Sequence, residues 1–128
     1  MLSRAAILVM RLLAFLPLAW VRALGRWLGL GLHMLAKRRR KIALTNLRLC
    51  FPERTEAERE AMVRQNFVYF MQAWLDRSWL WHAPRAVLES RFKRLGDWSV
   101  FQGEAPTIVF APHFYGLDAG AMALAMAA

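Results

Sequence analysis

The first 48 residues contain no acidic side chain, although they hold ten of the 18 lysines and arginines. The chain has one cysteine, Cys50, so it cannot form an intramolecular disulfide or a cluster of several thiolates; we expect a small packed residue there. Within residues 2–36 the longest uncharged runs are residues 12–21 and 27–36, ten residues each. A simple membrane-spanning helix needs about 18 to 20 apolar residues, so these runs disfavour one.

The apolar and the basic residues gather in the same third of the chain. Hydrophobic residues make up 58% of the sequence and the formal net charge is +9. The last 80 residues are nearly balanced, with eight basic and nine acidic side chains, so the positive charge belongs to the N-terminal third. A segment that is both basic and apolar favours an anionic membrane surface over a nucleic acid as its partner.

Residues 1–36 are expected to form a membrane-anchoring helix, whose apolar stretch over residues 2–36 carries one basic stripe. On an ideal helix, its four arginines fall within about 60° of one another. Pro17 and the glycines at 29 and 31 are expected to bend or break this helix. A one-sided stripe suits a helix lying in the membrane interface, or a tilted span whose arginines snorkel. The four arginines are Arg4, Arg11, Arg22 and Arg26.

Two other readings of this segment remain open. A cleavable signal peptide would carry Arg11 inside its apolar region, and the run KRRRK at residues 37–41 is a cytoplasmic retention signal, so both features disfavour it. An ordinary buried helix would need acidic partners for its arginines, and none is near in sequence. The run 37–41 could also serve as a nucleic-acid patch. We interpret residues 37–54 as a basic juxtamembrane segment.

A long helix is predicted from residue 55 to about His82. Thr55 and Glu58 form a capping box, in which a Ser or Thr precedes a Glu by three residues. Apolar residues then recur with helical spacing, and Pro84 ends the pattern. We place this helix at the start of a domain over residues 55–128. Its apolar positions are Met62, Val63, Phe67, Phe70, Met71, Trp74 and Leu75.

Two short segments after this helix are expected to be strands, which makes the predicted fold class α/β. Residues 90–95 form one expected strand, and residues 107–111 (TIVFA) read as a buried, parallel-type strand. His113 follows the second strand, and Asp118 lies five residues later near the start of a helix. A carboxylate that orients an imidazole gives a general base for an attacking hydroxyl. The alternative is that each residue only caps its own element.

Three features in this order resemble one family, the lauroyl and myristoyl acyltransferases of lipid A biosynthesis. They are the basic, membrane-seeking N-terminus, the segment NLRLCFPE at residues 46–53, and the His-x4-Asp spacing of His113 and Asp118. The family's motif often has Glu where this chain has Asp118. Between His113 and Asp118, this chain has Tyr115-Gly116-Leu117, where Gly-Asn-Trp is commoner in the family. This difference puts the choice of acceptor in doubt.

The resemblance implies a membrane-bound acyltransferase that works on the cytoplasmic face of the inner membrane. A fatty acyl thioester on an acyl carrier protein would be the donor, and a hydroxyl of a glycolipid, a lipid A precursor, the acceptor. His113 would be the general base and Asp118 its orienting carboxylate, with no metal or other cofactor and no nucleic-acid partner. Another lipid acceptor, such as a lysophospholipid or an aminolipid, and a non-catalytic membrane-binding module remain open.

The resemblance also implies that the chain is an N-terminal fragment. The family's later motifs, which are expected to bind the acceptor's phosphates and stabilise the oxyanion, would lie beyond residue 128. We therefore expect the 128-residue chain to be inactive by itself.

Overall fold

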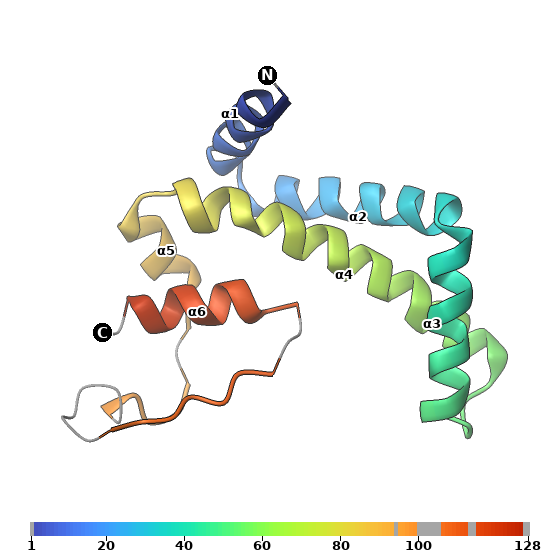
Figure 1. Cartoon of the computed structure of the whole chain (residues 1–128). Coiled ribbons are helices and arrows are strands. Elements are labelled where there is room, and N and C mark those ends of the chain that lie inside the picture. The colour runs from blue at the N-terminus through green and yellow to red at the C-terminus, as the bar shows by residue number, and fades with distance from the viewer. Residues whose placement is uncertain (1, 94, 100–105, 113–114, 127–128) are drawn as a thin grey trace. The chain divides into compact units, whose positions relative to one another are not determined.

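A computed structural model describes residues 2–93, 95–99, 106–112 and 115–126, and shows helices with short connections as far as α5 and a long connection before α6 (Figure 1). The chain divides into two compact units, Leu16–Leu75 and Met1–Phe15 with Asp76–Ala128. Helix α4 runs from the first unit into the second. The helices are α1 (Leu2–Ala14), α2 (Leu18–Leu35), α3 (Lys37–Cys50), α4 (Glu56–His82), α5 (Arg85–Arg91) and α6 (Leu117–Ala125).

The N-terminal apolar segment forms two helices that separate at Pro17. Proline has no N–H to donate and disfavours helical geometry in the residue before it, so α1 ends at Ala14 and α2 starts at Leu18. Gly29 and Gly31, where a bend was also expected, lie inside the uninterrupted α2. The break therefore depends on proline alone, and the predicted arginine stripe is shared between two helices.

Helix α2 packs against α4 through two glycines. A Cβ atom at Gly29 would lie 2.6 Å from the Cα of Val68 and 2.7 Å from the carbonyl oxygen of Phe67. A Cβ atom at Gly25 would lie 2.9 Å from the Cα of Gln72. The Gln72 side chain also donates a hydrogen bond of 3.0 Å to the Arg22 carbonyl oxygen. The two backbones approach so closely only because these positions lack side chains.

Helix α3 closes the core of the Leu16–Leu75 unit. Ala36, with φ −84° and ψ 56°, is the single residue between α2 and α3, and its N–H still bonds to the Leu32 carbonyl oxygen. The change of direction brings Leu44 onto Val63 and Phe67 of α4, and all three side chains are buried. The five cations at the start of α3 oppose its macrodipole, so this packing must offset an unfavourable helix start.

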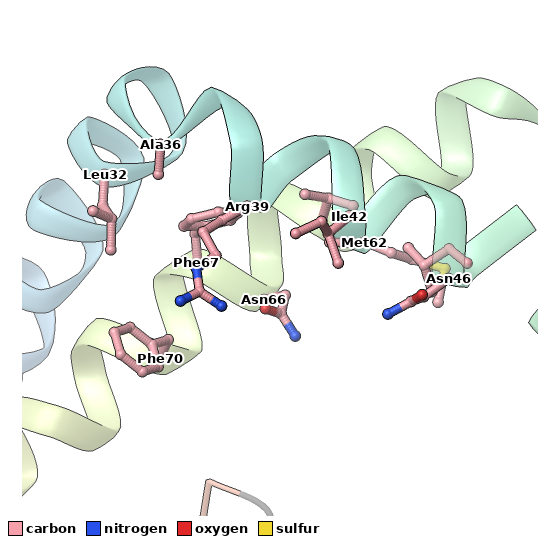
Figure 2. A pocket seen from close by; sticks show the side chains of 12 residues that line it. Leu32, Ala36, Arg39, Ile42, Asn46, Met62, Asn66, Phe67 and Phe70 are labelled. Atoms are coloured by element: carbon pink, nitrogen blue, oxygen red, sulfur yellow. The ribbon is translucent and has the colours of Figure 1, made fainter.

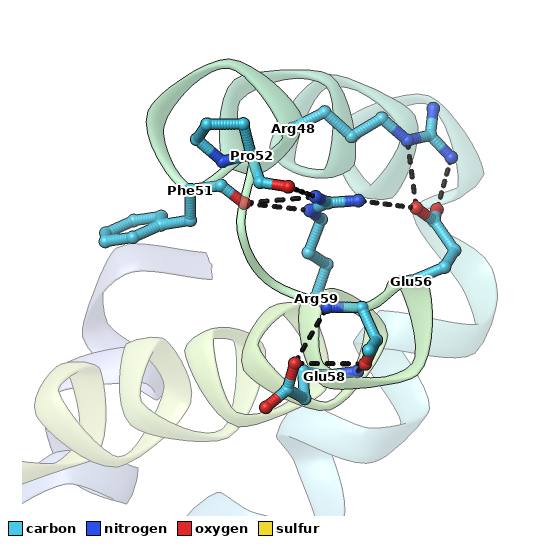
Figure 3. A network of polar contacts seen from close by, with 7 residues as sticks. Arg48, Phe51, Pro52, Glu56, Glu58 and Arg59 are labelled. Carbon is cyan, nitrogen blue, oxygen red and sulfur yellow. Dashed lines mark hydrogen bonds and ion pairs between the residues drawn. The ribbon is translucent and has the colours of Figure 1, made fainter.

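Arg59 holds the turn between α3 and α4 (Figure 3). Its guanidinium donates to the Phe51 carbonyl oxygen at 3.1 and 3.2 Å and to the Pro52 carbonyl oxygen at 2.8 Å. Glu56 bridges the helices because it accepts bonds from both Arg59 and Arg48. The segment NLRLCFPE therefore forms the end of α3 and a turn that one arginine fixes by charge-assisted bonds.

The predicted capping box is confirmed at the start of α4. The Thr55 N–H donates to the Glu58 carboxylate at 2.7 Å, and the Glu58 N–H donates to the Thr55 hydroxyl at 3.3 Å. The N–H of Thr55, followed by its hydroxyl, lowers the pKa of Glu58 because both stabilise the charged carboxylate. The predicted end is confirmed too, since α4 stops at His82, two residues before Pro84.

The predicted α/β fold is wrong for this chain. No strand occurs in the described residues: Ser90 and Arg91 belong to α5, and residues 107–111 form an extended segment without a neighbouring strand. The side chains of Ile108 and Phe110 are 97% and 89% exposed, where a buried strand was expected. A β-branched apolar run favours extended backbone, but it becomes a strand only when another strand pairs with its N–H and C=O groups.

Large apolar side chains lie on the surface of the N-terminal helices. Trp20, Trp27 and Met34 of α2 are 69%, 73% and 70% exposed, and they recur every seven residues on one face. Among the described residues, no helix has the combined length and apolar character that crossing a membrane requires.

The glycine contact gives the first testable prediction. Gly29→Ala should lower the free energy of unfolding by about 1–3 kcal/mol, because its methyl group would overlap the backbone of α4. Gly31→Ala is the matched control. A Cβ there meets nothing within 4 Å, so higher helix propensity should raise stability by roughly 0.5–1 kcal/mol. Urea unfolding followed by circular dichroism measures both, and stabilisation by both alanines would contradict the close packing.

The turn between α3 and α4 gives the second prediction. Arg59→Met should lower the free energy of unfolding by roughly 2–3 kcal/mol, because two carbonyl groups lose charged donors. Arg54→Met is the control, since Arg54 is half-exposed and its ion pairs with exposed glutamates are worth less than about 1 kcal/mol. The same unfolding measurement applies, and equal losses in the two variants would show that Arg59 does not fix the turn.

Candidate active site

The structure describes one member of the predicted catalytic pair. His113 lies outside the described residues, so its pairing with Asp118 remains a prediction. Asp118 is the second residue of α6, directly after Leu117 and close to the N-cap Gly116. A carboxylate in the first turn of a helix is favoured by the positive end of the helix dipole. The predicted place of Asp118, near a helix start, is confirmed.

Asp118 is bound by an arginine that the sequence did not reveal. The Nε atom of Arg77, in α4, lies 2.6 Å from Oδ2 of Asp118, and the two groups form an ion pair. The side chains are 36% and 39% exposed, so the bond is partly shielded from water. The contact joins two residues that are 41 positions apart in sequence, and it fixes the direction of the Asp118 carboxylate. Charge-assisted bonds of this kind are about twice as strong as neutral ones.

The Arg77 guanidinium also lies over an aromatic ring. Its central carbon is 5.7 Å from the ring centroid of Trp81, one helical turn later in α4. A cation over the face of an indole is attracted by the ring quadrupole, so Trp81 restricts the positions of the guanidinium. The spacing of i and i+4 on one helix allows this contact. Trp81 therefore supports a charged residue.

Both ends of α6 are tied to earlier helices of its unit. Arg77 binds Asp118 at the start of α6, and Arg85 of α5 donates a hydrogen bond of 3.3 Å to the Met126 carbonyl oxygen just past its end. Ala123, between these ties, is buried. Two arginines from different helices therefore determine where α6 lies relative to the end of α4.

The free oxygen of Asp118 decides what the arrangement can do. Arg77 occupies Oδ2, and among the described residues no hydrogen bond reaches Oδ1. A carboxylate accepts hydrogen bonds on both oxygens, so Oδ1 can receive one further donor, such as an imidazole N–H. Within the described part of the chain, no group of three or more His, Cys, Asp or Glu side chains gathers at one point.

Sequence reasoning could not have found Arg77. It lies 41 residues before Asp118, and no spacing rule relates the interior of one helix to the first turn of another helix so distant. The only local signal is an arginine four residues before a tryptophan, and that pattern is common on helix surfaces. The contact arises from the path of the chain between α4 and α6.

A groove in the Leu16–Leu75 unit contains none of the predicted catalytic residues. This groove of about 790 Å³ opens between α2, α3 and α4. Figure 2 shows the polar ends of Arg39, Asn46 and Asn66 on the same side of it. Its lining contains no carboxylate, histidine or thiol, so it can hold an apolar group but cannot supply a base or a nucleophile. It is lined by Leu32, Ala36, Arg39, Ile42, Ala43, Asn46, Leu47, Met62, Val63, Asn66, Phe67 and Phe70.

Comparison with known proteins places these residues in a family. Residues 1–128 match the family described as bacterial lipid A biosynthesis acyltransferase. The lipid A biosynthesis acyltransferase of Haemophilus influenzae is 30% identical over 116 residues, which cover 88% of this chain and 36% of that protein. The lipid A biosynthesis myristoyltransferase of Escherichia coli is 35% identical over 109 residues, 80% of this chain and 31% of that protein.

A third relative agrees with these two. The lipid A biosynthesis lauroyltransferase of Escherichia coli is 33% identical over 106 residues, covering 77% of this chain and 35% of that protein. The chain thus spans about a third of the length of the curated relatives it matches. No solved structure matches the chain. The family match extends over every residue of the chain, and the chain belongs to the bacterial lipid A biosynthesis acyltransferases.

Proposed function

We propose that this chain takes part in transferring a fatty acyl group from an acyl carrier thioester to a hydroxyl of a lipid A precursor. The observation that carries the proposal is the family match, which covers residues 1–128 and so includes both His113 and Asp118. The relatives are named as myristoyl- and lauroyltransferases of lipid A biosynthesis, so acyl transfer to that class of lipid is the chemistry they suggest.

The reaction needs one base and one orienting group. His113 removes the proton of the acceptor hydroxyl while the oxygen attacks the thioester carbonyl. A carbon–oxygen bond forms, the carbon–sulfur bond breaks, and the imidazolium returns its proton to the departing thiolate. Asp118 holds the imidazole in the required tautomer and stabilises its cation. Atoms and charges balance in these steps without an oxidant, a reductant or a metal ion.

Arg77 acts as the positioning residue for Asp118. Its bond to Oδ2 directs the other oxygen, Oδ1, toward a single remaining donor. Without that bond the carboxylate could rotate and turn away from the imidazole, since side chains of this exposure are otherwise free to change rotamer. The ion pair thus supports the geometry that the proposed base requires.

This role gives a prediction for kinetics in membranes from cells that express the variant genes. Arg77→Gln should lower kcat by about tenfold to a hundredfold, less than the roughly 10²–10⁴-fold that a general base contributes and that His113→Ala should remove. The acidic limb of the pH profile should move to higher pH, because losing the cation lets Asp118 stabilise the imidazolium more strongly. Arg77→Lys, which keeps the positive charge, should return the acidic limb to its wild-type pH.

The control for Arg77 is Arg85→Gln. Arg85 ties the other end of α6 and makes no described bond to Asp118, so this variant should lose stability while its pH profile stays unchanged. If the pH profiles of Arg77→Gln and Arg85→Gln shifted equally, Arg77 would only stabilise the position of α6 and would not position Asp118. If His113→Ala left the acylated lipids unchanged, the non-catalytic membrane-binding module would be favoured instead.

We also propose that the chain lies on the cytoplasmic face of the inner membrane, with α2 in the bilayer interface. The exposed stripe of Trp20, Trp27 and Met34 supports this. Trp27 lies halfway between Gly25 and Gly29 in sequence, and therefore on the side of α2 opposite its contact with α4. The cations of α3 offer attraction to anionic headgroups at about 1 kcal/mol each.

The proposed location predicts the effect of removing the tryptophans. The double substitution Trp20→Ala and Trp27→Ala should weaken partition into anionic vesicles by about tenfold or more, since each indole can bury 150–250 Å². Trp74→Ala is the matched control, because Trp74 is an exposed tryptophan of α4 that is not part of the α2 stripe. Flotation with vesicles at high salt measures both variants. Complete loss of wild-type binding at high salt would contradict apolar insertion and favour a purely electrostatic partner such as nucleic acid.

A further inference from the structure

A basic notch lies on the flank of α2, beside the apolar stripe. It has a volume of about 420 Å³ between α2 and the facing side of α4. Arg26 and Arg64 supply its charge, and Gln65, Gln72 and Tyr69 supply further polar atoms. Its remaining lining residues are apolar: Leu30, Ala61 and Val68. Every residue of this notch lies within the Leu16–Leu75 unit.

No carboxylate lines the notch, so its own residues do not balance its positive charge. Among the described ion pairs and hydrogen bonds, none involves the side chain of Arg26 or Arg64. This differs from Arg48, Arg54 and Arg59, which all pair with glutamates around the turn between α3 and α4. Two guanidinium groups that share a hollow without an acid form a site for an anion.

The pKa of His33 also responds to the positive charge beside the notch. His33 lies on the same flank of α2, with its ring edge-on to Phe67 at 5.5 Å. Burial lowers the pKa of His33, and the nearby Arg40 and Arg64 lower it further, while Glu60 opposes them. The guanidinium of Arg64 thus contributes positive potential on this flank of α2. An anion bound in the notch would neutralise it.

The position of the notch indicates where the anion comes from. Arg26 precedes the exposed Trp27 by one residue, so the two side chains point about 100° apart around α2. Leu30 of the notch lies between these directions. When the stripe of Trp20, Trp27 and Met34 enters the apolar region of a bilayer, the notch faces sideways at the level of the headgroups.

From this placement, we infer that the notch between Arg26 and Arg64 binds the phosphate monoester of a lipid headgroup. A monoester carries between one and two negative charges at neutral pH, which matches the two guanidinium groups. It also offers three terminal oxygens to their forked donors, with Gln65 and Gln72 in reach of the same hollow. A phosphodiester has one charge and fewer free oxygens, so it fits the site less well. The inference rests on the proposed membrane location and is independent of the transfer chemistry.

Vesicle binding by the 128-residue chain tests the inference. Phosphatidylcholine vesicles would contain either phosphatidic acid, a monoester, or phosphatidylglycerol, a diester, at matched surface charge. The wild-type chain should bind the monoester vesicles about tenfold more tightly. The double variant Arg26→Gln with Arg64→Gln should lose that preference and keep its binding to the diester vesicles. Circular dichroism checks that the helices persist, which is expected because both arginines are exposed and unpaired among the described residues.

The matched control is the double variant Arg38→Gln with Lys41→Gln. It removes the same charge from exposed positions of α3 outside the notch, so it should weaken binding to both kinds of vesicle and keep the preference for the monoester. Loss of the preference in this control, or its survival in the notch variant, would overturn the assignment to Arg26 and Arg64.

The remaining outcomes separate the possible causes. Equal binding of the wild-type chain to both kinds of vesicle would overturn the notch and leave the membrane location standing. No binding to either would overturn both. An excess of soluble glycerol 3-phosphate distinguishes the source of the phosphate. If it abolishes the preference, the phosphate group alone is recognised, and if the preference persists, the group is recognised at the bilayer surface; either result supports a monoester site.

Discussion

The close approach of α2 and α4 at Gly25 and Gly29 is the constraint on which the Leu16–Leu75 unit depends. It brings the two backbones into contact and leaves space beside the contact for the apolar groove and for the basic notch. It also directs the tryptophans of α2 away from α4, so the face that is most costly to expose to water has no partner within the unit. A bilayer would cover that face and offer anions to the cations beside it.

The ion pair between Arg77 and Asp118 has the corresponding role in the other unit. It connects the last turns of α4 with the first turn of α6, and it leaves one carboxylate oxygen open among the described residues. This bond thus ties one end of a helix and sets the direction of a group proposed to orient the base. Arginine suits this task because its planar fork of donors holds a carboxylate in a defined direction, which the ammonium of lysine does less well.

Local signals in the sequence predicted local structure well. Pro17, Pro84 and the capping box of Thr55 and Glu58 act through neighbouring backbone groups, and each lies where a helix starts or ends. The predicted strand at residues 107–111 failed because strand formation depends on a partner that no residue of the segment specifies. Contacts between distant residues were invisible for the same reason: Gly29 was read as a bend and became a packing contact, and Arg77 was not recognised.

The central claim is that His113 and Asp118 belong to an enzyme that acylates a lipid A precursor, and lipid A itself reports on it most directly. Mass spectrometry would compare the lipid A of cells with and without the gene that encodes this chain. Deleting the gene should produce lipid A that is lighter by one fatty acyl group, and restoring the gene with an intact His113 should return the missing mass. Identical lipid A in both cells, with another class of lipid changed or none, would contradict the claim.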